Sequence, residues 1–347
     1  MSRKSFYLSI VATTRNDNHG GDLLKRTCAF INSVYTQSSK FNFPVELIIV
    51  EWNPPKYKSL LKEDLPKPPS DCPAVLRIIT VPEETHNSYR FADSIPLYQM
   101  IAKNVGIRRA KGEFVLCTNI DILFSDMNFE LLAEKSLEKG NYYRANRCDI
   151  PKEVMEYDEL ASQLKYAEQN ILRRMGNTPG HEAISGPPIM FKYAWVASFL
   201  NKAALFAWKI FKNGEFPHIV VDFMACGDYT LMSKEDWMRI DGYVELDMYS
   251  IHVDSMALWS CNALGIEQQI FPYKACVYHI DHEDGWESDD LIKTIRFLSN
   301  KPSLDYSIVH RAGMKLVAEG KNWGLNKPDW GWANEDFDEY IFEGKLA

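Results

Sequence analysis

Apolar runs of strand length alternate with helical segments in the first third of the chain. The runs are rich in β-branched residues, which predicts strands over 5–14, 43–52, 74–82 and 113–119. Apolar residues recur at helical spacing over 23–39 and 94–112, and we predict helices there, with Asp22 as an N-cap and Gly112 as a C-cap. This alternation predicts an α/β fold with a mostly parallel sheet flanked by helices.

The pattern changes twice further along the chain. Helical and irregular features follow the alternating part, and short strands then return, with a predicted helix over 251–266 and a late strand over 267–282. The end of the chain predicts a helix and then an acidic, aromatic terminus. We therefore divide the chain into an alternating part, a helical insertion, a second part of the α/β domain and a helical, acidic-aromatic tail, which cover residues 1–142, 143–216, 217–288 and 289–347.

The most apolar stretch of the chain covers residues 193–211. A helix that spans a membrane needs about 20 nearly uninterrupted apolar residues, whereas this stretch contains Asn201, Lys202 and Lys209. We predict a helix of the core or a lid, in preference to a helix on a membrane surface. Peripheral contact with a membrane stays open as the alternative.

Composition and charge narrow the class of protein. The 347 residues carry 39 Lys and Arg against 47 Asp and Glu, a net charge of -8, which argues against a nucleic-acid binder with a basic face. The 7 cysteines are scattered, with no Cys-x-x-Cys pair, as is typical of a reducing compartment. Residues 1–17 lack the apolar core and cleavage site of a secretory signal. We therefore expect a cytoplasmic protein.

Polar side chains follow three of the predicted strands. Since open α/β sheets bind ligands at the carboxyl ends of their parallel strands, we expect these side chains to lie on one rim of the sheet, although they are far apart in sequence. They are Thr13, Arg15, Asp17, Glu51, Asn119 and Asp121.

Six motifs follow one another in a consistent order over residues 6–287. The first three are SIVATTRND, ELIIVEWNPP and KNVGIRRAKGEFVLCTNIDI, and the others are CGDYTLMSKEDWMRIDGYVE, HVDSMALWSCNALGI and VYHIDHEDGWE. This series resembles the GT-A-fold glycosyltransferases, close to their family 2 type. The chain departs from that family at two positions, because Asn119 opens an Asn-x-Asp where many members have Asp-x-Asp, and Glu51 replaces the usual aspartate.

The resemblance implies a metal site of Asp121 and His279, holding Mn²⁺ or Mg²⁺ against a diphosphate. Oxygen ligands and neutral imidazole suit such ions. Residues two apart on an extended strand end face the same way, so Asn119 points to the same site, where we assign it to ribose or a metal-bound water. His282 is the less favoured ligand. The alternatives are a turn after the strand for Asn119 and Asp121, and a capping role for His279.

The resemblance also implies a binding site for a nucleotide sugar. The rim of the first two strands, with Thr13, Arg15, Asp17 and Glu51, would hold the base and ribose, and the alternative for Arg15 and Asp17 is a surface salt bridge of little energy. Asn104 and Arg108 share a helix face and are expected at the sugar or phosphates. Gly227 and Asp228 are expected there too, and an ordinary tight turn is the alternative for them.

Asp254 is the expected general base in this resemblance. It opens a predicted helix, where family 2 enzymes have an acidic pair, here Val253-Asp254. An inverting transfer needs a carboxylate that takes the proton of the acceptor hydroxyl. The alternative role is an N-cap of that helix, which aspartate fills well.

The sequence thus predicts an inverting glycosyltransferase. It would move a sugar from a nucleotide donor, UDP-linked by preference, to a hydroxyl of a glycan or a lipid-linked acceptor. One alternative is a non-catalytic module that binds nucleotide sugar or glycan, favoured by Asn119 and Val253. A less favoured one is a nucleotidyltransferase, which would normally carry a Gly-rich loop with a basic residue after the first strand.

Overall fold

The computed structural model describes residues 5–175, 194–211, 219–282 and 301–344. Its main sheet has eight strands in the order β10-β6-β9-β4-β1-β2-β3-β12. A second sheet of four strands has the order β5-β11-β7-β8. The strands of the main sheet are β1 (Phe6–Thr14), β2 (Val45–Trp52), β3 (Val75–Val81), β4 (Gly112–Cys117), β6 (Asn141–Arg144), β9 (Thr230–Ser233), β10 (Glu267–Ile270) and β12 (Asp338–Glu343). Those of the second are β5 (Ile122–Phe124), β7 (Arg147–Ile150), β8 (Arg173–Met175) and β11 (Val277–Ile280).

Strands β4, β1, β2 and β3 are the parallel centre of the main sheet. All four were predicted from their apolar runs. Their side chains alternate between the two faces, so that Leu47 and Ile49 of β2 enter one apolar cluster while Ile48 and Val50 enter another. Burial on both faces explains why these strands are apolar throughout instead of alternating. The predicted α/β class, with a large central sheet flanked by helices, is confirmed.

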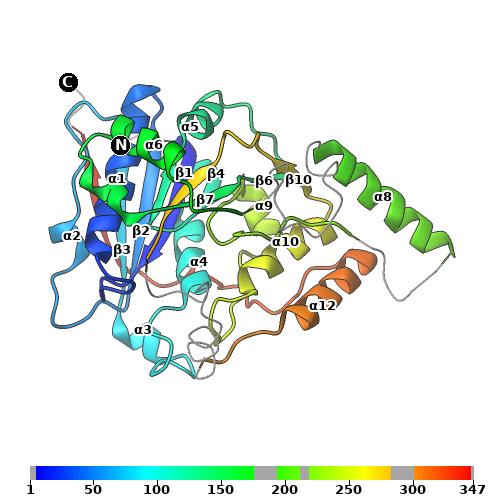
Figure 1. The fold of residues 1–347 in the computed structure, drawn as a ribbon. Coiled ribbons are helices and arrows are strands. Elements are labelled where there is room, and N and C mark those ends of the chain that lie inside the picture. The colour runs from blue at the N-terminus through cyan, green and yellow to red at the C-terminus, as the bar shows by residue number, and fades with distance from the viewer. Residues whose placement is uncertain (1–4, 176–193, 212–218, 283–300, 345–347) are drawn as a thin grey trace.

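Helices cover both faces of the sheet, as Figure 1 shows. Helix α1 (Leu23–Lys40) contributes to one apolar cluster, together with α5 (Asp126–Ala133). Helices α4 (Gln99–Arg109) and α10 (Val253–Ala263) contribute to the other. The other helices of the described residues are α2 (Leu61–Asp64), α3 (Glu83–Asn87), the 3-10 helix η1 (Lys152–Glu156), α6 (Leu160–Gln169), α8 (Ala194–Phe211), α9 (Lys234–Arg239) and α12 (Tyr306–Glu319).

Several predicted boundaries differ from the structure. The helix expected over 94–112 is the shorter α4, and Gly112 begins β4 instead of capping the helix. A Cβ at this position would lie 2.5 Å from the Ser9 nitrogen, so the close approach of β4 to β1 requires glycine. Asp22 precedes α1 but makes no capping bond, since its φ of 48° is left-handed. The late strand expected over 267–282 is two strands, β10 and β11.

The outer parts of the chain contain more strand than was predicted. Segment 143–216, expected to be helical, holds α6 and α8 but also β7 and β8. The C-terminal tail contains α12, and β12 then pairs antiparallel with β3 at the edge of the main sheet. These strands are short and carry many polar residues, which gives little periodicity. Among the described residues, no helix is both long and apolar enough to span a membrane.

A buried ion pair joins four strands of the main sheet. Arg77 of β3 contacts Glu46 of β2, and both side chains are almost inaccessible. Glu46 also accepts bonds from the Ser9 hydroxyl and, at 2.7 Å, from the Lys111 backbone nitrogen. Arg77 donates to Glu339 of β12 at 2.6 Å. The pair thereby fixes β12 and the end of α4 against the centre of the sheet.

We predict that Arg77→Met lowers the free energy of unfolding by about 3–5 kcal/mol, because it leaves Glu46 buried without its cation. The double variant with Glu46→Gln should recover part of that loss. Urea unfolding followed by circular dichroism measures both. Lys139→Met is the control, since Lys139 forms exposed pairs with Glu113 and Glu235. A loss in Arg77→Met no larger than in this control would contradict the prediction.

Candidate metal centre

The candidate site lies at the carboxyl ends of β1 and β4. The strand order reverses here, because β2 and β3 continue on one side of β1 whereas β4 lies on the other. Open α/β sheets bind ligands at such a reversal. The segments after the two strands meet at this point, where Arg26 of α1 donates to Asp121, four residues after β4, over 3.1 Å.

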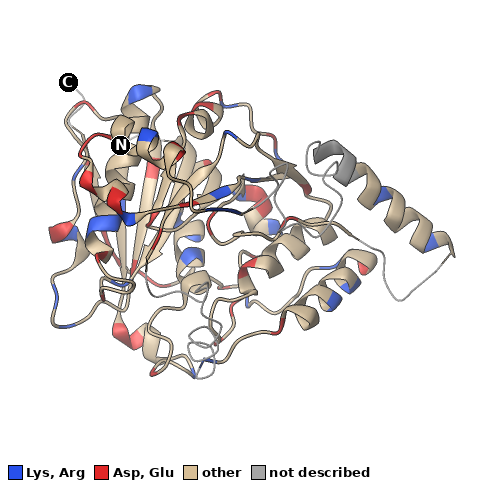
Figure 2. Cartoon of the chain, in the orientation of Figure 1, with Lys and Arg blue, Asp and Glu red and all other residues tan. Residues whose placement is uncertain are grey.

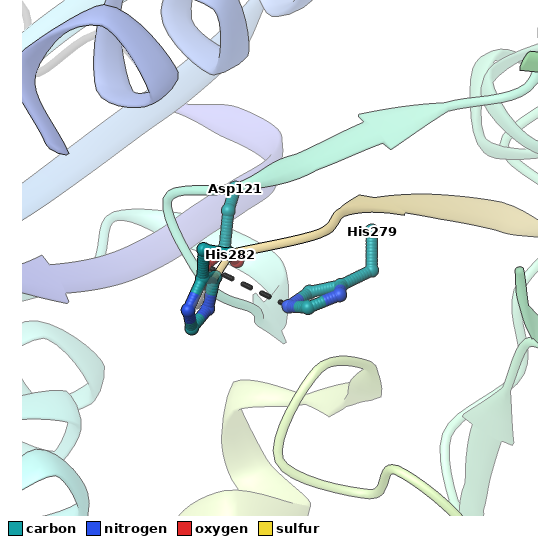
Figure 3. Close-up of side chains that lie close together, drawn as sticks. All are labelled: Asp121, His279 and His282. Atoms are coloured by element: carbon teal, nitrogen blue, oxygen red, sulfur yellow. Dashed lines mark ion pairs between the residues drawn. The ribbon is translucent and has the colours of Figure 1, made fainter. Parts of the chain in front are cut away.

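Three side chains at this edge are placed to hold a metal ion. They are Asp121, His279 and His282, and one ligand atom from each lies within 4.8 Å of the others. Asp121 Oδ2 lies 3.8 Å from His279 Nε2 and 3.4 Å from His282 Nε2. Figure 3 shows the two imidazoles beside the carboxylate. The structure therefore brings the two predicted ligands together, and it adds His282, which the sequence had made the less favoured ligand.

Local pairing explains how these residues meet. Strand β5 runs antiparallel to β11, with Ile122 opposite His279. The Ile280 nitrogen donates to the Asp121 carbonyl at 2.9 Å. His282 follows two residues after the end of β11 and lies beside Gly20, where a Cβ would come 2.7 Å from His282 Nδ1. The loop after β1 therefore needs glycine at this position to approach the site.

The charges of the site keep Asp121 ionised. Burial raises the pKa of this carboxyl, but the nearby His279, His282 and Arg26 outweigh it, so the pKa lies well below its ordinary value. The pKa of His279 is raised. Burial and Arg147 lower it, and the carboxylates of Asp121, Asp149 and Asp228 more than offset this.

The donor atoms fit a divalent transition-metal ion. Asp121 Oδ1 is buried and has no hydrogen-bond partner among the residues that the structure describes, although its other oxygen receives Arg26. An unpaired buried carboxylate oxygen is costly unless a ligand satisfies it. Two imidazoles and one carboxylate suit Mn²⁺ better than Mg²⁺, which prefers oxygen ligands.

A buried carboxylate lies behind His279 at ion-pair distance, although the contact does not have hydrogen-bond geometry. Asp149 Oδ1 of β7 lies 3.3 Å from His279 Nδ1, so that the other ring nitrogen faces Asp121. Arg147 donates to Asp149 at 2.6 Å and to Asp228 at 2.7 Å, and Arg173 donates to Asp149 at 2.7 Å. Such partners fix the orientation of a metal-binding histidine and strengthen the ligand.

Asn119 connects this network to α4 and does not join the candidate ligands. Its side-chain oxygen accepts bonds from Gln99 and Lys103, each at 2.8 Å, and its amide nitrogen donates to Asp228. An aspartate could accept the first two bonds but could not donate to a second carboxylate. This explains physically why Asn119 stands where the resembling family often has aspartate.

Lys103 extends the network to Asp254. Its ammonium, which is fully buried, donates to the Gly227 carbonyl at 2.7 Å. A Cβ on Gly227 would lie 3.0 Å from Asp254 Oδ2, so glycine allows this close approach. Asp254 lies in the first turn of α10, whose N-cap position belongs to His252, and its other oxygen accepts the Ser255 N–H at 2.9 Å. The alternative role of Asp254 as the N-cap is therefore wrong.

The residues expected on the rim of β1 and β2 have different surroundings. The Thr13 hydroxyl donates to the Val50 carbonyl at 3.0 Å. Glu51 is fully buried, accepts the Leu61 N–H at 2.9 Å, and has a pKa raised by burial. Arg15 and Asp17 pair at 3.2 Å and remain partly exposed. In this structure Thr13 and Glu51 thus bond to the protein itself, and Arg15 and Asp17 are the accessible members.

Asn104 holds the segment after α9, and Arg108 holds the C-terminal tail. Asn104 is buried and donates to the Tyr243 carbonyl at 2.8 Å and to Glu245 at 3.0 Å. Arg108 donates to the Trp330 carbonyl at 2.9 Å, and its guanidinium lies 4.0 Å from the centre of the Trp330 ring. The structure does not bring these two side chains into contact with the candidate metal ligands.

No protein-family model matches the chain, and no curated protein matches it. Among solved structures, the chain is similar to the galactosyltransferase LgtC in complex with donor and acceptor sugar analogues. The match covers 88% of this chain and 99% of that protein, with a TM-score of 0.35 and 11% sequence identity. The assignment of the site therefore depends on the geometry of the chain itself.

We predict that Asp149→Asn weakens the binding of Mn²⁺ about 10–100-fold, because His279 loses the partner that orients its ring. Isothermal titration calorimetry with Mn²⁺ alone measures this directly. Asp17→Asn, a partly exposed carboxylate in the neighbouring loop, is the matched control. Equal Mn²⁺ affinities in the two variants would exclude a role for Asp149 in orienting His279.

Proposed function

We propose that this chain is a metal-dependent, inverting glycosyltransferase that takes its sugar from a nucleotide donor, UDP-linked by preference. The observation that supports this most is the position of Asp121, His279 and His282 at the reversal of strand order between β1 and β4. A diphosphate placed there would meet both a cation site and the loop after β1. The acceptor in this proposal is a hydroxyl of a glycan or of a lipid-linked sugar.

Each part of the site has a role in the proposal. Asp121, His279 and His282 would hold Mn²⁺, which when bound neutralises negative charge on the diphosphate leaving group. Arg15 and Asp17 remain accessible to the nucleotide. Residues 1–142 thus supply the nucleotide side and residues 217–288 the acceptor side. We assign Asn104 and Arg108 no contact with the donor, because Asn104 bonds Tyr243 and Glu245 and Arg108 bonds the tail.

Asp254 is the proposed general base. The acceptor oxygen forms a bond to the anomeric carbon as the bond from that carbon to the diphosphate oxygen breaks, and the diphosphate leaves with the electron pair. The hydroxyl proton passes to the Asp254 carboxylate. Asp254 Oδ2 faces Gly227, and Lys103 and Asn119 connect that glycine to Asp228. This network would fix the base relative to the metal ligands.

We predict that Mn²⁺ together with one nucleotide raises the melting temperature, and that Asp121→Asn removes the metal-dependent part of the shift. Binding at a concentration of 100 times Kd stabilises a protein by about 2.7 kcal/mol. Thermal unfolding with UDP, GDP, CMP and dTDP, with and without Mn²⁺, gives the measurement. Asp126→Asn, an exposed carboxylate next to β5, is the control. No shift with any of the four nucleotides would contradict the proposal.

We predict that Asp254→Asn lowers kcat about 10²–10⁴-fold while the Kd for the nucleotide with Mn²⁺ stays within a factor of two, because only proton transfer is lost. Release of nucleotide from the donor in the presence of acceptor measures turnover. Asp247→Asn, in the loop before α10, is the matched control. If the wild-type chain binds the donor but never transfers its sugar, the non-catalytic binding module becomes the better assignment. Nucleotide transfer in place of sugar transfer would instead favour the nucleotidyltransferase.

A further inference from the structure

Helix α8 extends away from the body of the molecule, as Figure 1 shows. Its described side chains include some of the most exposed large apolar groups of the chain, with Phe199 at 63%, Phe206 at 67% and Phe211 at 70% exposure. Ile210 and Leu200 are exposed as well. Single exposed apolar residues are normal on a protein surface, whereas a group on one helix marks an interaction site.

The apolar residues form a stripe on the outer face of α8. Phe199, Phe206 and Ile210 are separated by seven and four residues, so they lie on one face, with Ala203 between them. The opposite face meets the body, where the Asn201 side chain bonds both backbone groups of Val220 and Leu205 packs against the core. A solvated surface helix has the reverse arrangement, with its polar face outward.

The charge of α8 identifies the kind of surface that would cover this stripe. Residues 194–211 contain Lys202 and Lys209 and no Asp or Glu, and Figure 2 shows blue and no red on the helix. At 100° per residue both lysines lie along one border of the stripe. Lys202 forms an ion pair with Glu267 of β10, so Lys209 supplies most of the net positive charge of the helix. The chain as a whole has a net charge of -8, so α8 is a basic, apolar element on an acidic protein. This charge favours an anionic partner surface.

We propose that α8 lies in the interface of a bilayer that contains anionic lipids, with Phe199, Phe206 and Ile210 among the acyl chains and Lys209 at the headgroups. Helices of this composition bind in the plane of the interface and do not span the membrane, in agreement with the absence of a spanning helix among the described residues. A second copy of this chain is the less favoured partner. Its own α8 would bring a second positive charge to the contact, and two chains with the same net negative charge repel each other.

The test is cosedimentation of the full chain with 100 nm vesicles. Vesicles of phosphatidylcholine with about 30% phosphatidylglycerol should bind the protein, and pure phosphatidylcholine should bind it about fivefold more weakly, since one lysine near an anionic surface contributes about a factor of five. Phe199→Ser with Phe206→Ser should lower the partition coefficient about 100-fold, or about tenfold for each apolar side chain. Lys209→Gln should abolish the preference for anionic lipid.

The control is Tyr57→Ser, which removes an apolar side chain that is 78% exposed outside α8 and should leave binding unchanged. Circular dichroism confirms that each variant is folded. Equal binding of the wild type and the double Phe variant would overturn the proposal, as would the absence of binding to anionic vesicles. A concentration-dependent dimer that the double Phe variant abolishes would assign the face to a second copy instead. Nucleotide binding is measured separately and does not depend on α8.

Discussion

Three carboxylates buried at one edge of the sheet impose the main constraint on this structure. Asp121, Asp149 and Asp228 are each less than 10% exposed, and a buried charge is tolerated only when it is paired. Arg26 compensates Asp121, and Arg147 bridges the other two. His279 of β11 lies beside both Asp121 and Asp149. Because these residues come from distant parts of the chain, their contacts hold α1, β7, β11 and the segment before β9 together at the end of β4.

The same constraint determines the chemistry of the neighbouring side chains. Asp228 already receives Arg147 on one oxygen, and its other oxygen receives the amide of Asn119. Asn119 must therefore donate on one side and accept from Lys103 on the other, which an amide does and a carboxylate does not. Lys103 in turn fixes the Gly227 carbonyl close to Asp254. A change of charge at one of these positions is thus expected to disturb the others.

The sequence predicted the parts of the structure that depend on local patterns. The four central strands are buried on both faces, so their apolar runs were visible without any knowledge of their partners. Asp121 follows one of these runs, and the ends of parallel strands converge at one edge. His279 lies in the short apolar strand β11 of the second sheet. Arg26, Arg147 and Asp149 escaped prediction, because their roles come from contacts such as Arg26 with Asp121, which are 95 residues apart. His282 was visible beside His279, but only the turn after β11 brings its ring to the carboxylate.

Asn104 and Arg108 show the limit of arguments from a helix face. They do share one face of α4, as four-residue spacing requires, but that face meets Tyr243 and Glu245 of the segment after α9 and Trp330 of the C-terminal tail. The tail was predicted only from its composition, and nothing in its sequence indicated that it returns to the sheet. The polar residues of α4 that do point toward the site are Gln99 and Lys103, which lie on a different face of the helix and donate to Asn119. Which face of a helix reaches a ligand is therefore set by the packing of its partners, and spacing alone gives only the residues that act together.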